Sequence, residues 1–318
     1  MRVLITGGAG FIGRNLSEHL CADSSVDEIR VFDDGSSGDP ERLSHLPIRY
    51  IAGSVCDADA LLDASDGVDT IVHLAAHHGS GVGVCDPATT VAVNVMGTLN
   101  VLEAARSAGD AHVVMASSAA VYGANPALPS HEDLTPLPRS PFAASKLAAE
   151  ALCASYQTSF GVPSLVLRLF DVYGPHQRAD AGEGAVVASF VNAALEGEPL
   201  QIFGDGRQTR DFIDVDTVCR VIAVALADRV SHARPMNIAS GRRTSVLELA
   251  QIVAATVGGP ISLRNESQRT GEDRNRCGDI ERMRARFVHV VPTDIEQGIE
   301  RMVTWARVAQ RSDLISVW

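Results

Sequence analysis

Short apolar runs alternate with longer amphipathic stretches over the first half of the chain. The apolar runs predict strands at residues 2–6, 29–32, 49–52, 70–74, 112–116 and 164–170. Apolar positions at helical spacing predict helices over residues 11–20, 88–108 and 140–160. Strands that alternate with helices are typical of a parallel sheet covered by helices on both faces. We therefore expect the first half to be a doubly wound α/β unit.

Glycines with a fixed spacing follow the first strand. Gly7, Gly10 and Gly13 precede or enter the helix that begins at Phe11 and Ile12. Gly7 permits a tight turn, Gly10 lets the backbone approach a pyrophosphate, and Gly13 lets the helix pack closely on the strand. The helix N-terminus would hold the pyrophosphate. This order of strand, turn and helix predicts a Rossmann dinucleotide site.

A carboxylate at the end of the second strand indicates which dinucleotide binds. Asp33 stands 20 positions after Gly13 (33 − 13), where an acidic residue accepts hydrogen bonds from the adenosine ribose hydroxyls. The same charge repels a 2′-phosphate, so we expect NAD rather than NADP. The alternative is a glycine-rich turn followed by an unrelated surface carboxylate.

The rhythm of strands and helices changes after residue 172. Loops then carry more Gly, Pro and Arg, and the predicted helices are shorter. We expect an NAD-binding domain over residues 1–172 and a smaller, C-terminal substrate-binding domain over 173–318. The segment 211–240 is expected to return to the first domain.

Composition narrows the range of partners. The net charge of −12 and the pI near 5.2 argue against nucleic acid or an anionic membrane surface. The apolar runs are too short for a membrane span, and the N-terminus runs directly into the glycine motif, so we expect no signal peptide. Six cysteines without a CxxC pair indicate reduced thiols and a cytoplasmic protein. We expect no metal site.

Lys146 is the single lysine beside 26 arginines. Arg cannot lose its proton at a useful pH, whereas the Lys ammonium is compact and its pKa can be tuned. A genome biased toward Arg would explain the scarcity of Lys but not its retention at one position. The alternative is chance survival of one lysine.

Several motifs, in order along nearly the whole chain, resemble one enzyme family. They are Gly7–Gly13, His73–Ala76, Asn94–Thr98, Ser117–Gly123, Ser145-Lys146, Arg168–Pro175 and Gly204–Phe212. Together they resemble the extended short-chain dehydrogenases/reductases, and within them the UDP-glucose 4-epimerase and NDP-sugar dehydratase group. The resemblance implies an NAD-dependent enzyme with a nucleotide-sugar-binding domain over residues 173–318.

The resemblance also assigns roles to individual residues. It implies that Asn94 holds the loop beneath the cofactor, that Lys146 bonds the nicotinamide ribose, and that Ser118 bonds the sugar hydroxyl to be oxidised. It places against the cofactor the residues Leu74, Ala75, Ala76 and, at the adenine, Val55. It places against a UDP-sugar the residues Asp171, Val186, Phe203, Arg210, Arg269 and Glu272, of which the arginines would clamp the diphosphate.

The sequence departs from the family at the catalytic positions. Phe142 stands where the family has the tyrosine of Tyr-x-x-x-Lys, and phenylalanine has no proton to exchange. Ala119-Ala120 stands where 4,6-dehydratases carry an Asp-Glu pair. Ser54 replaces a common adenine-contacting Asp. The histidines His77 and His78 and the thiol of Cys85 follow the fourth strand and are candidate acids or bases, although each could be an ordinary loop residue.

Three interpretations of function remain open. The first is a UDP-hexose or UDP-N-acetylhexosamine dehydratase in antibiotic or glycan biosynthesis, which oxidises C4 transiently, eliminates water across C5 and C6 and recycles NAD. The second is a UDP-glucose or UDP-N-acetylglucosamine 4-epimerase. The third is a catalytically dead binding protein. By resemblance, the helices over 88–108 and 140–160 would form a homodimer interface.

Overall fold

The computed structural model describes residues 1–78, 86–179, 185–259, 262–267 and 274–315, with side chains described as far as residue 310. Its centre is a seven-stranded sheet, and every neighbouring pair of strands in it is parallel. The strand order is β11-β6-β5-β4-β1-β2-β3. The strands are β1 (Arg2–Thr6), β2 (Glu28–Asp33), β3 (Arg49–Ala52), β4 (Thr70–His73), β5 (His112–Ser118), β6 (Ser164–Leu169) and β11 (Met236–Ile238).

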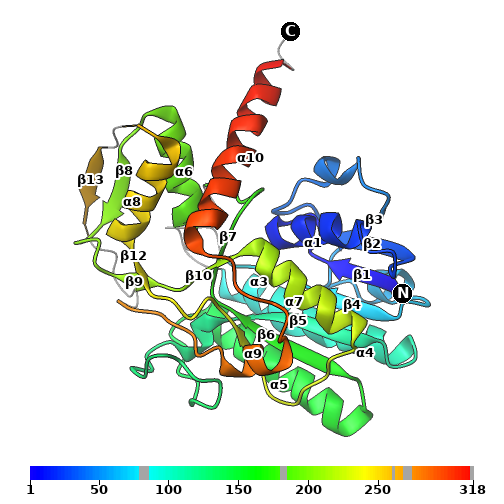
Figure 1. Cartoon of the computed structure of the whole chain (residues 1–318). Coiled ribbons are helices and arrows are strands. Elements are labelled where there is room, and N and C mark those ends of the chain that lie inside the picture. Colours follow the sequence, from blue (N-terminus) through cyan, green and yellow to red (C-terminus); the bar gives the residue numbers. More distant parts are fainter. Residues whose placement is uncertain (79–85, 180–184, 260–261, 268–273, 316–318) are drawn as a thin grey trace.

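Helices cover both faces of this sheet (Figure 1). One face packs against α1 (Phe11–Cys21) and α7 (Val215–Ala227), and its core contains Val3, Ile5 and Leu16. The other packs against α2 (Ala58–Ala64), α4 (Gly97–Ser107) and α5 (Pro141–Phe160), and its core contains Leu4. Alternate residues of β1 therefore face opposite cores, as expected for a strand buried on both sides. The chain has the doubly wound α/β fold expected from the sequence.

The predicted helix over residues 88–108 is more complex than its apolar pattern indicates. The structure divides it into α3 (Pro87–Val91), a π-helical segment η2 (Ala92–Met96) and α4. The prediction of one regular helix was wrong at η2, because hydrophobic spacing does not register a single widened turn. Such π segments are often found at functional sites.

Residues beyond β6 build a second cluster and also extend the sheet. β11 adds a strand beside β6, and α7 packs on α1. The hydrophobic core of this second cluster, the third core of the chain, contains side chains of α6 (Val186–Glu196), α8 (Val246–Val257) and α10 (Ile295–Ile315). The small pairs are β7 (Asp171–Tyr173) with β10 (Phe212–Asp214), β8 (Leu200–Phe203) with β13 (Leu263–Glu266), and β9 (Thr209–Arg210) with β12 (Thr244–Ser245).

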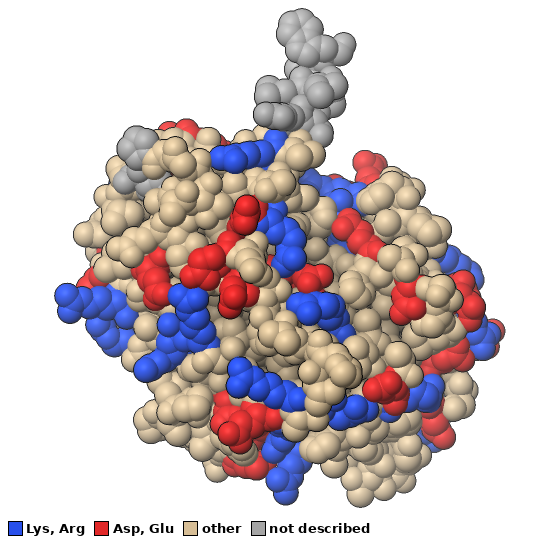
Figure 2. All heavy atoms as spheres, viewed as in Figure 1, with Lys and Arg blue, Asp and Glu red and all other residues tan. Residues whose placement is uncertain are grey.

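The remaining short helices are α9 (Glu281–Arg286) and the 3-10 turns η1 (Pro40–Leu43) and η3 (Ala119–Tyr122). Among the residues that the structure describes, no helix is long and apolar enough to cross a membrane. On the face shown in Figure 2, basic and acidic side chains are interspersed.

Candidate active site

The glycine turn after β1 has the geometry that a pyrophosphate site requires. Gly7 has a φ of +69°, and a Cβ atom there would lie 2.5 Å from the backbone nitrogen of Ala75. A Cβ at Gly13 would lie 2.6 Å from the Gly7 carbonyl oxygen. Gly10 is the N-cap of α1 and provides no side-chain cap. The first turn of α1 therefore keeps backbone N–H groups for an anion, as in a dinucleotide fold.

Asp33 is part of this turn and not a surface carboxylate. It is 8% exposed, its Oδ2 accepts a hydrogen bond from the Ala9 backbone nitrogen at 2.9 Å, and its Oδ1 accepts one from Gly35 at 2.8 Å. Burial raises the pKa of Asp33, against the effect of these two hydrogen bonds. The carboxylate joins the end of β2 to the glycine turn, and each oxygen keeps a lone pair for a ribose hydroxyl.

The loop after β4 lies against the same turn. It contains Leu74, Ala75 and Ala76, and the Ala75 backbone lies where a Cβ atom on Gly7 would have to fit. Val55 lies behind it, 4% exposed, where its side chain packs so closely on Gly97 that a Cβ on Gly97 would lie 2.6 Å from Val55 Cγ2. The contact of Val55 with adenine stays a prediction.

Asn94, in the π-helical segment η2, holds this loop to α5. Its Oδ1 accepts a hydrogen bond from the His77 backbone nitrogen at 2.7 Å, and its Nδ2 donates to the His77 carbonyl oxygen at 3.0 Å. Nδ2 also donates to Ser145 Oγ at 2.9 Å. Because Asn94 is only 1% exposed, the buried amide has few alternatives to these partners. One side chain thus fixes both the loop and the start of α5.

The lysine that the sequence singles out is buried beneath the end of β5. Lys146 is 5% exposed, and its Nζ donates to the Ala116 carbonyl oxygen at 2.9 Å. Burial lowers the pKa of Lys146 to about 8. Ser118 ends β5 and is half-buried, and its Oγ caps η3 by accepting a hydrogen bond from Ala120 at 3.1 Å. Both side chains thus belong to the carboxyl end of the sheet, where doubly wound folds bind ligands.

Phe142 lies one helical turn before Lys146 on α5. The Lys146 Nζ is 6.0 Å from the centre of the Phe142 ring, and the ring centres of Phe142 and His78 are 4.7 Å apart. No tyrosine compensates, because each of the four hydroxyls donates elsewhere. Their acceptors are Asp33 O for Tyr50, Asn237 Oδ1 for Tyr122, Glu103 Oε1 for Tyr156 and Ile295 O for Tyr173.

The other candidate acids and bases after β4 differ in placement. The His77 Nδ1 lies 3.1 Å from Thr90 Oγ1, so its ring is bound to α3. His78 is exposed, with its ring against Phe142. Cys85 lies outside the described residues. Of the two histidines, only His78 contacts the position of the missing tyrosine.

The predicted substrate residues lie on several elements of the second cluster. Val186 begins α6, Phe203 ends β8, and Arg210 lies on β9 with its Nη1 donating to the Thr209 carbonyl oxygen at 3.0 Å. Asp171 lies on β7, and its backbone nitrogen donates to the carbonyl oxygen of Asp211, next to Arg210. Arg269 and Glu272 lie outside the described residues.

The structure adds Arg276, which the sequence analysis missed. Its Nη1 lies 3.9 Å from Asp171 Oδ1, and its backbone nitrogen donates to Thr209 O, beside Arg210. Asp171 Oδ2 is buried and has no hydrogen-bond partner among the described residues. By resemblance, the family usually has an Asn at the position of Asp171. Arg276 thus offsets the charge that this acid introduces. One arginine among 26 gave no signal for this pairing in the sequence.

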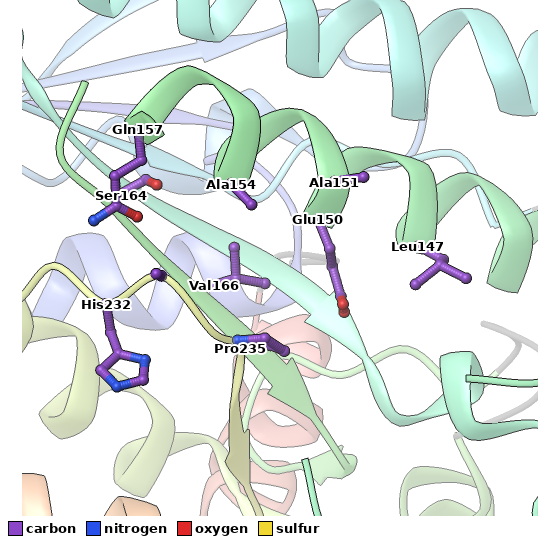
Figure 3. Close-up of a pocket in the computed structure, with 10 residues that line it drawn as sticks. Leu147, Glu150, Ala151, Ala154, Gln157, Ser164, Val166, His232 and Pro235 are labelled. Atoms are coloured by element: carbon purple, nitrogen blue, oxygen red, sulfur yellow. The ribbon is translucent and has the colours of Figure 1, made fainter. Parts of the chain in front are cut away.

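A buried ion pair between Arg168 and Glu150 holds α5, the helix that carries Lys146, against the sheet. Arg168 of β6 donates to Glu150 of α5, with Nη2 2.7 Å from Oε2, and Ser117 Oγ donates to Glu150 Oε1. Figure 3 shows the Glu150 side chain extending from α5 beside a hollow of about 250 Å³. The residues that line this hollow include none of the predicted site residues. The ion pair therefore supports the site without forming part of it.

A family model for the NAD dependent epimerase/dehydratase family matches residues 3–239. The chain belongs to this family. It is 36% identical over 313 residues to a UDP-glucose 4-epimerase of Mycolicibacterium smegmatis, covering 96% of this chain and 99% of that one. The family assignment confirms the resemblance identified from the motifs, and NAD is the cofactor.

Solved structures of family members share the whole fold. A UDP-glucose 4-epimerase of Thermotoga maritima with UDP-glucose superimposes with a TM-score of 0.90, at 29% identity, over 98% of this chain and 100% of that one. A dTDP-glucose 4,6-dehydratase of Streptomyces venezuelae with NAD and TYD bound gives a TM-score of 0.86, at 30% identity, over 96% of this chain and 97% of that one. The likeness therefore spans both an isomerase and a lyase.

The residues of this family member fit a bound NAD. The uncapped turn of α1 suits the pyrophosphate, and Asp33 suits the adenosine ribose. Lys146 and Ser118 would lie on the nicotinamide side. NAD, when bound, removes and returns a hydride. The chain must orient the sugar and move protons, and at Phe142 it has no group to do so.

Proposed function

We propose that the protein is a nucleotide-sugar dehydratase that oxidises C4 of a UDP-hexose or UDP-N-acetylhexosamine transiently, eliminates water across C5 and C6, and recycles its NAD. The C4 ketone acidifies the C5 proton, loss of that proton expels the 6-hydroxyl, and hydride return to C4 leaves a 5,6-alkene. The sum of these steps is the loss of one water, and NAD is unchanged.

The replacement of the tyrosine by Phe142 is the observation that carries this proposal. In a plain 4-epimerase a tyrosinate is the acid and base, and the loss of such a group costs about 10²–10⁴ in rate. The usual Asp-Glu pair of a 4,6-dehydratase is also absent, because Ala119 and Ala120 occupy its positions in η3. This pattern resembles the UDP-N-acetylglucosamine 5,6-dehydratase of tunicamycin biosynthesis.

The second candidate is a UDP-glucose or UDP-N-acetylglucosamine 4-epimerase. It is favoured by the Mycolicibacterium smegmatis relative and by the Thermotoga maritima structure. In this case the same C4 oxidation occurs, the 4-keto sugar rotates within the site, and hydride returns to the opposite face of its C4 carbonyl. The two candidates share every residue of the cofactor site and differ in what happens to the C5 proton.

Product analysis separates the candidates. Purified protein with NAD is incubated with UDP-glucose and with UDP-N-acetylglucosamine, and products are identified by NMR and mass spectrometry. A vinylic proton with loss of one water supports elimination, and an inverted C4 coupling pattern supports epimerisation. A Lys146→Met variant is the inactive control. A wild-type protein that binds NAD but leaves a panel of UDP-sugars unchanged would instead be a binding protein.

We also propose a homodimer through α3, η2, α4 and α5, the elements of the predicted helices over residues 88–108 and 140–160. Three large apolar side chains on these elements are about half exposed, namely Val91 at 48%, Met96 at 49% and Phe160 at 51%. Burying them against the same surface of a second copy would remove apolar area from water. Sedimentation at micromolar concentration should give twice the chain mass, and Val91→Glu with Met96→Glu should give the monomer. A wild-type monomer would contradict the proposal.

A further inference from the structure

The position left without a tyrosine hydroxyl has an imidazole beside it. The His78 and Phe142 rings are 4.7 Å apart with an interplanar angle of 36°. Lys146 lies on the same Phe142 ring, with Nζ 6.0 Å from its centre. The apolar ring that replaces the family's phenol is therefore in contact with one titratable ring and close to the buried ammonium.

Hydrogen bonds of the Asn94 side chain fix the backbones that carry the His78 and Phe142 rings. The Asn94 side chain hydrogen-bonds both the nitrogen and the carbonyl oxygen of His77, which fixes the backbone immediately before His78. The same Asn94 amide donates to Ser145 Oγ, and Ser145 Oγ donates to the carbonyl oxygen of Phe142 at 2.8 Å. A chain of hydrogen bonds therefore joins the backbones that carry the two rings.

The neighbouring histidine is held in a different environment. The His77 Nδ1 pairs with Thr90 Oγ1, and that hydroxyl in turn donates to the Asp86 carbonyl oxygen at 2.8 Å. His77 thus has a structural partner on α3, whereas His78 is exposed and its ring rests on Phe142. The side chain that can meet a ligand at Phe142 is that of His78.

The charge state of His78 suits a proton acceptor. The residue as a whole is exposed, but burial of its ring among protein atoms lowers the pKa of His78 to about 4. The charges of Lys146 and then of His77 contribute in the same direction. Even at its ordinary pKa near 6.5 the imidazole would be mostly neutral at pH 7.5. An imidazolium formed beside the Lys146 cation is acidic, so it would readily return the proton.

We propose that His78 is a catalytic residue that accepts the proton of the sugar C4 hydroxyl, the task that tyrosine performs elsewhere in the family. This inference rests on the proposed C4 oxidation and applies to either candidate reaction. The O–H bond breaks and its electrons form the C4 carbonyl. The C4 hydrogen leaves as hydride to NAD, the oxidant of this family, and the proton goes to the imidazole. Reduction of the ketone reverses these steps.

The first test compares His78→Gln with wild type on the substrate that the product analysis identifies. The variant should lose about 10²–10⁴ in kcat, while the Kd values of NAD and of UDP, measured by calorimetry, change less than about threefold. Adding Phe142→Tyr to His78→Gln should raise kcat at least tenfold above that of the single variant His78→Gln, because it supplies a phenol next to Lys146. A His78→Gln variant with a kcat within threefold of wild type would overturn the inference and leave the proposed function intact.

The second test does not depend on turnover. The imidazole of His78 is followed by NMR in the NAD complex, before and after addition of UDP-glucose, with the exposed His131 as the internal control. A hydrogen bond from the sugar should shift the His78 resonances and leave those of His131 unchanged. Saturated binding of UDP-glucose without a shift at His78 would overturn the inference, even for a protein that turns over no sugar.

Discussion

The Lys146 ammonium on α5 lies 6.0 Å from the centre of the Phe142 ring, one turn earlier on the same helix. A cation this close to a tyrosine would stabilise the phenolate and lower its pKa. Beside phenylalanine the same cation has a ring face and the Ala116 carbonyl oxygen as neighbours. The lysine is retained while its usual partner in proton transfer is lost.

Restoring the phenol should change the distribution of products. We expect Phe142→Tyr to raise the rate of C4 epimerisation at least tenfold relative to elimination, because a phenol beside Lys146 can protonate the C4 oxygen and so speeds reduction of the ketone before the C5 proton is lost. The ratio of the two products, measured by NMR on one substrate, tests this. Phe142→Leu is the matched control, since it changes the ring without adding a hydroxyl. An identical product ratio in Phe142→Tyr would show that the pathway was not altered at this position.

The pKa of Lys146 predicts an alkaline limit to activity. Burial lowers this pKa from 10.5 to about 8, so the ammonium is present below pH 8 and is lost as the pH rises through 8. The kcat should therefore fall about tenfold per pH unit above that value, since the neutral amine no longer stabilises negative charge on the sugar oxygen. Lys146→Arg keeps its charge above pH 8, so its residual activity should not show this alkaline decrease. A wild-type rate constant that does not fall up to pH 9.5 would contradict the prediction.

Asp33 should determine the preference for NAD over NADP. Asp33→Asn replaces one of the two oxygens that accept from Ala9 and Gly35 by an amide donor and removes the charge predicted to face the ribose, so we expect the Kd of NAD to rise about tenfold and that of NADP to fall. Asp34→Asn is the control, because Asp34 is exposed and accepts a hydrogen bond from Ser36 in a local turn. Equal effects of the two substitutions on NAD binding would argue against a cofactor role for Asp33.

Removing one partner of the buried ion pair beneath α5 should be strongly destabilising. Glu150→Ala leaves the Arg168 guanidinium buried without its partner, and we expect a loss of about 3–5 kcal/mol in the free energy of unfolding. Asp228→Ala removes the exposed partner of Arg286 and should cost less than about 1 kcal/mol. Denaturant unfolding of both variants tests this. A small loss for Glu150→Ala would mean that water or another side chain reaches Arg168.

The first half of the fold follows closely from sequence patterns. The strand over residues 2–6 and that over 49–52 have the predicted bounds, because each is a short apolar run cut off by turn residues. The glycine spacing likewise predicts the turn at Gly7, whose positive φ only glycine adopts readily. These features depend on residues close together in the chain, which is why periodicity and spacing reveal them.

Other features depend on contacts between distant segments. The π-helical turn contains Asn94, whose amide bonds to both His77 and Ser145. The contact between His78 and Phe142 joins residues 64 positions apart (142 − 78), and no local pattern encodes it. The sequence therefore predicted the cofactor turn in detail and the proton-transfer site only as a set of candidates.

Arg276 and Asp171 provide a last prediction about the substrate side. Their charged atoms lie 3.9 Å apart, with the Asp171 side chain 11% exposed and that of Arg276 28% exposed. If the positive charge of Arg276 offsets the negative charge of Asp171, Arg276→Gln leaves an uncompensated carboxylate near the predicted diphosphate position. Because this carboxylate repels the diphosphate, the Kd of UDP should rise about tenfold. Asp171→Asn restores the family's residue and should change binding much less.

The double variant tests the pairing itself. Asp171→Asn with Arg276→Gln removes both charges, so it should recover most of the affinity lost in Arg276→Gln, with a coupling of about 0.5–3 kcal/mol between the sites. Calorimetric titration with UDP measures all four proteins of the cycle. Arg274→Gln is a suitable control, because Arg274 is exposed and pairs with Asp205. Additive effects of the two substitutions would show that Arg276 acts on the nucleotide independently of Asp171.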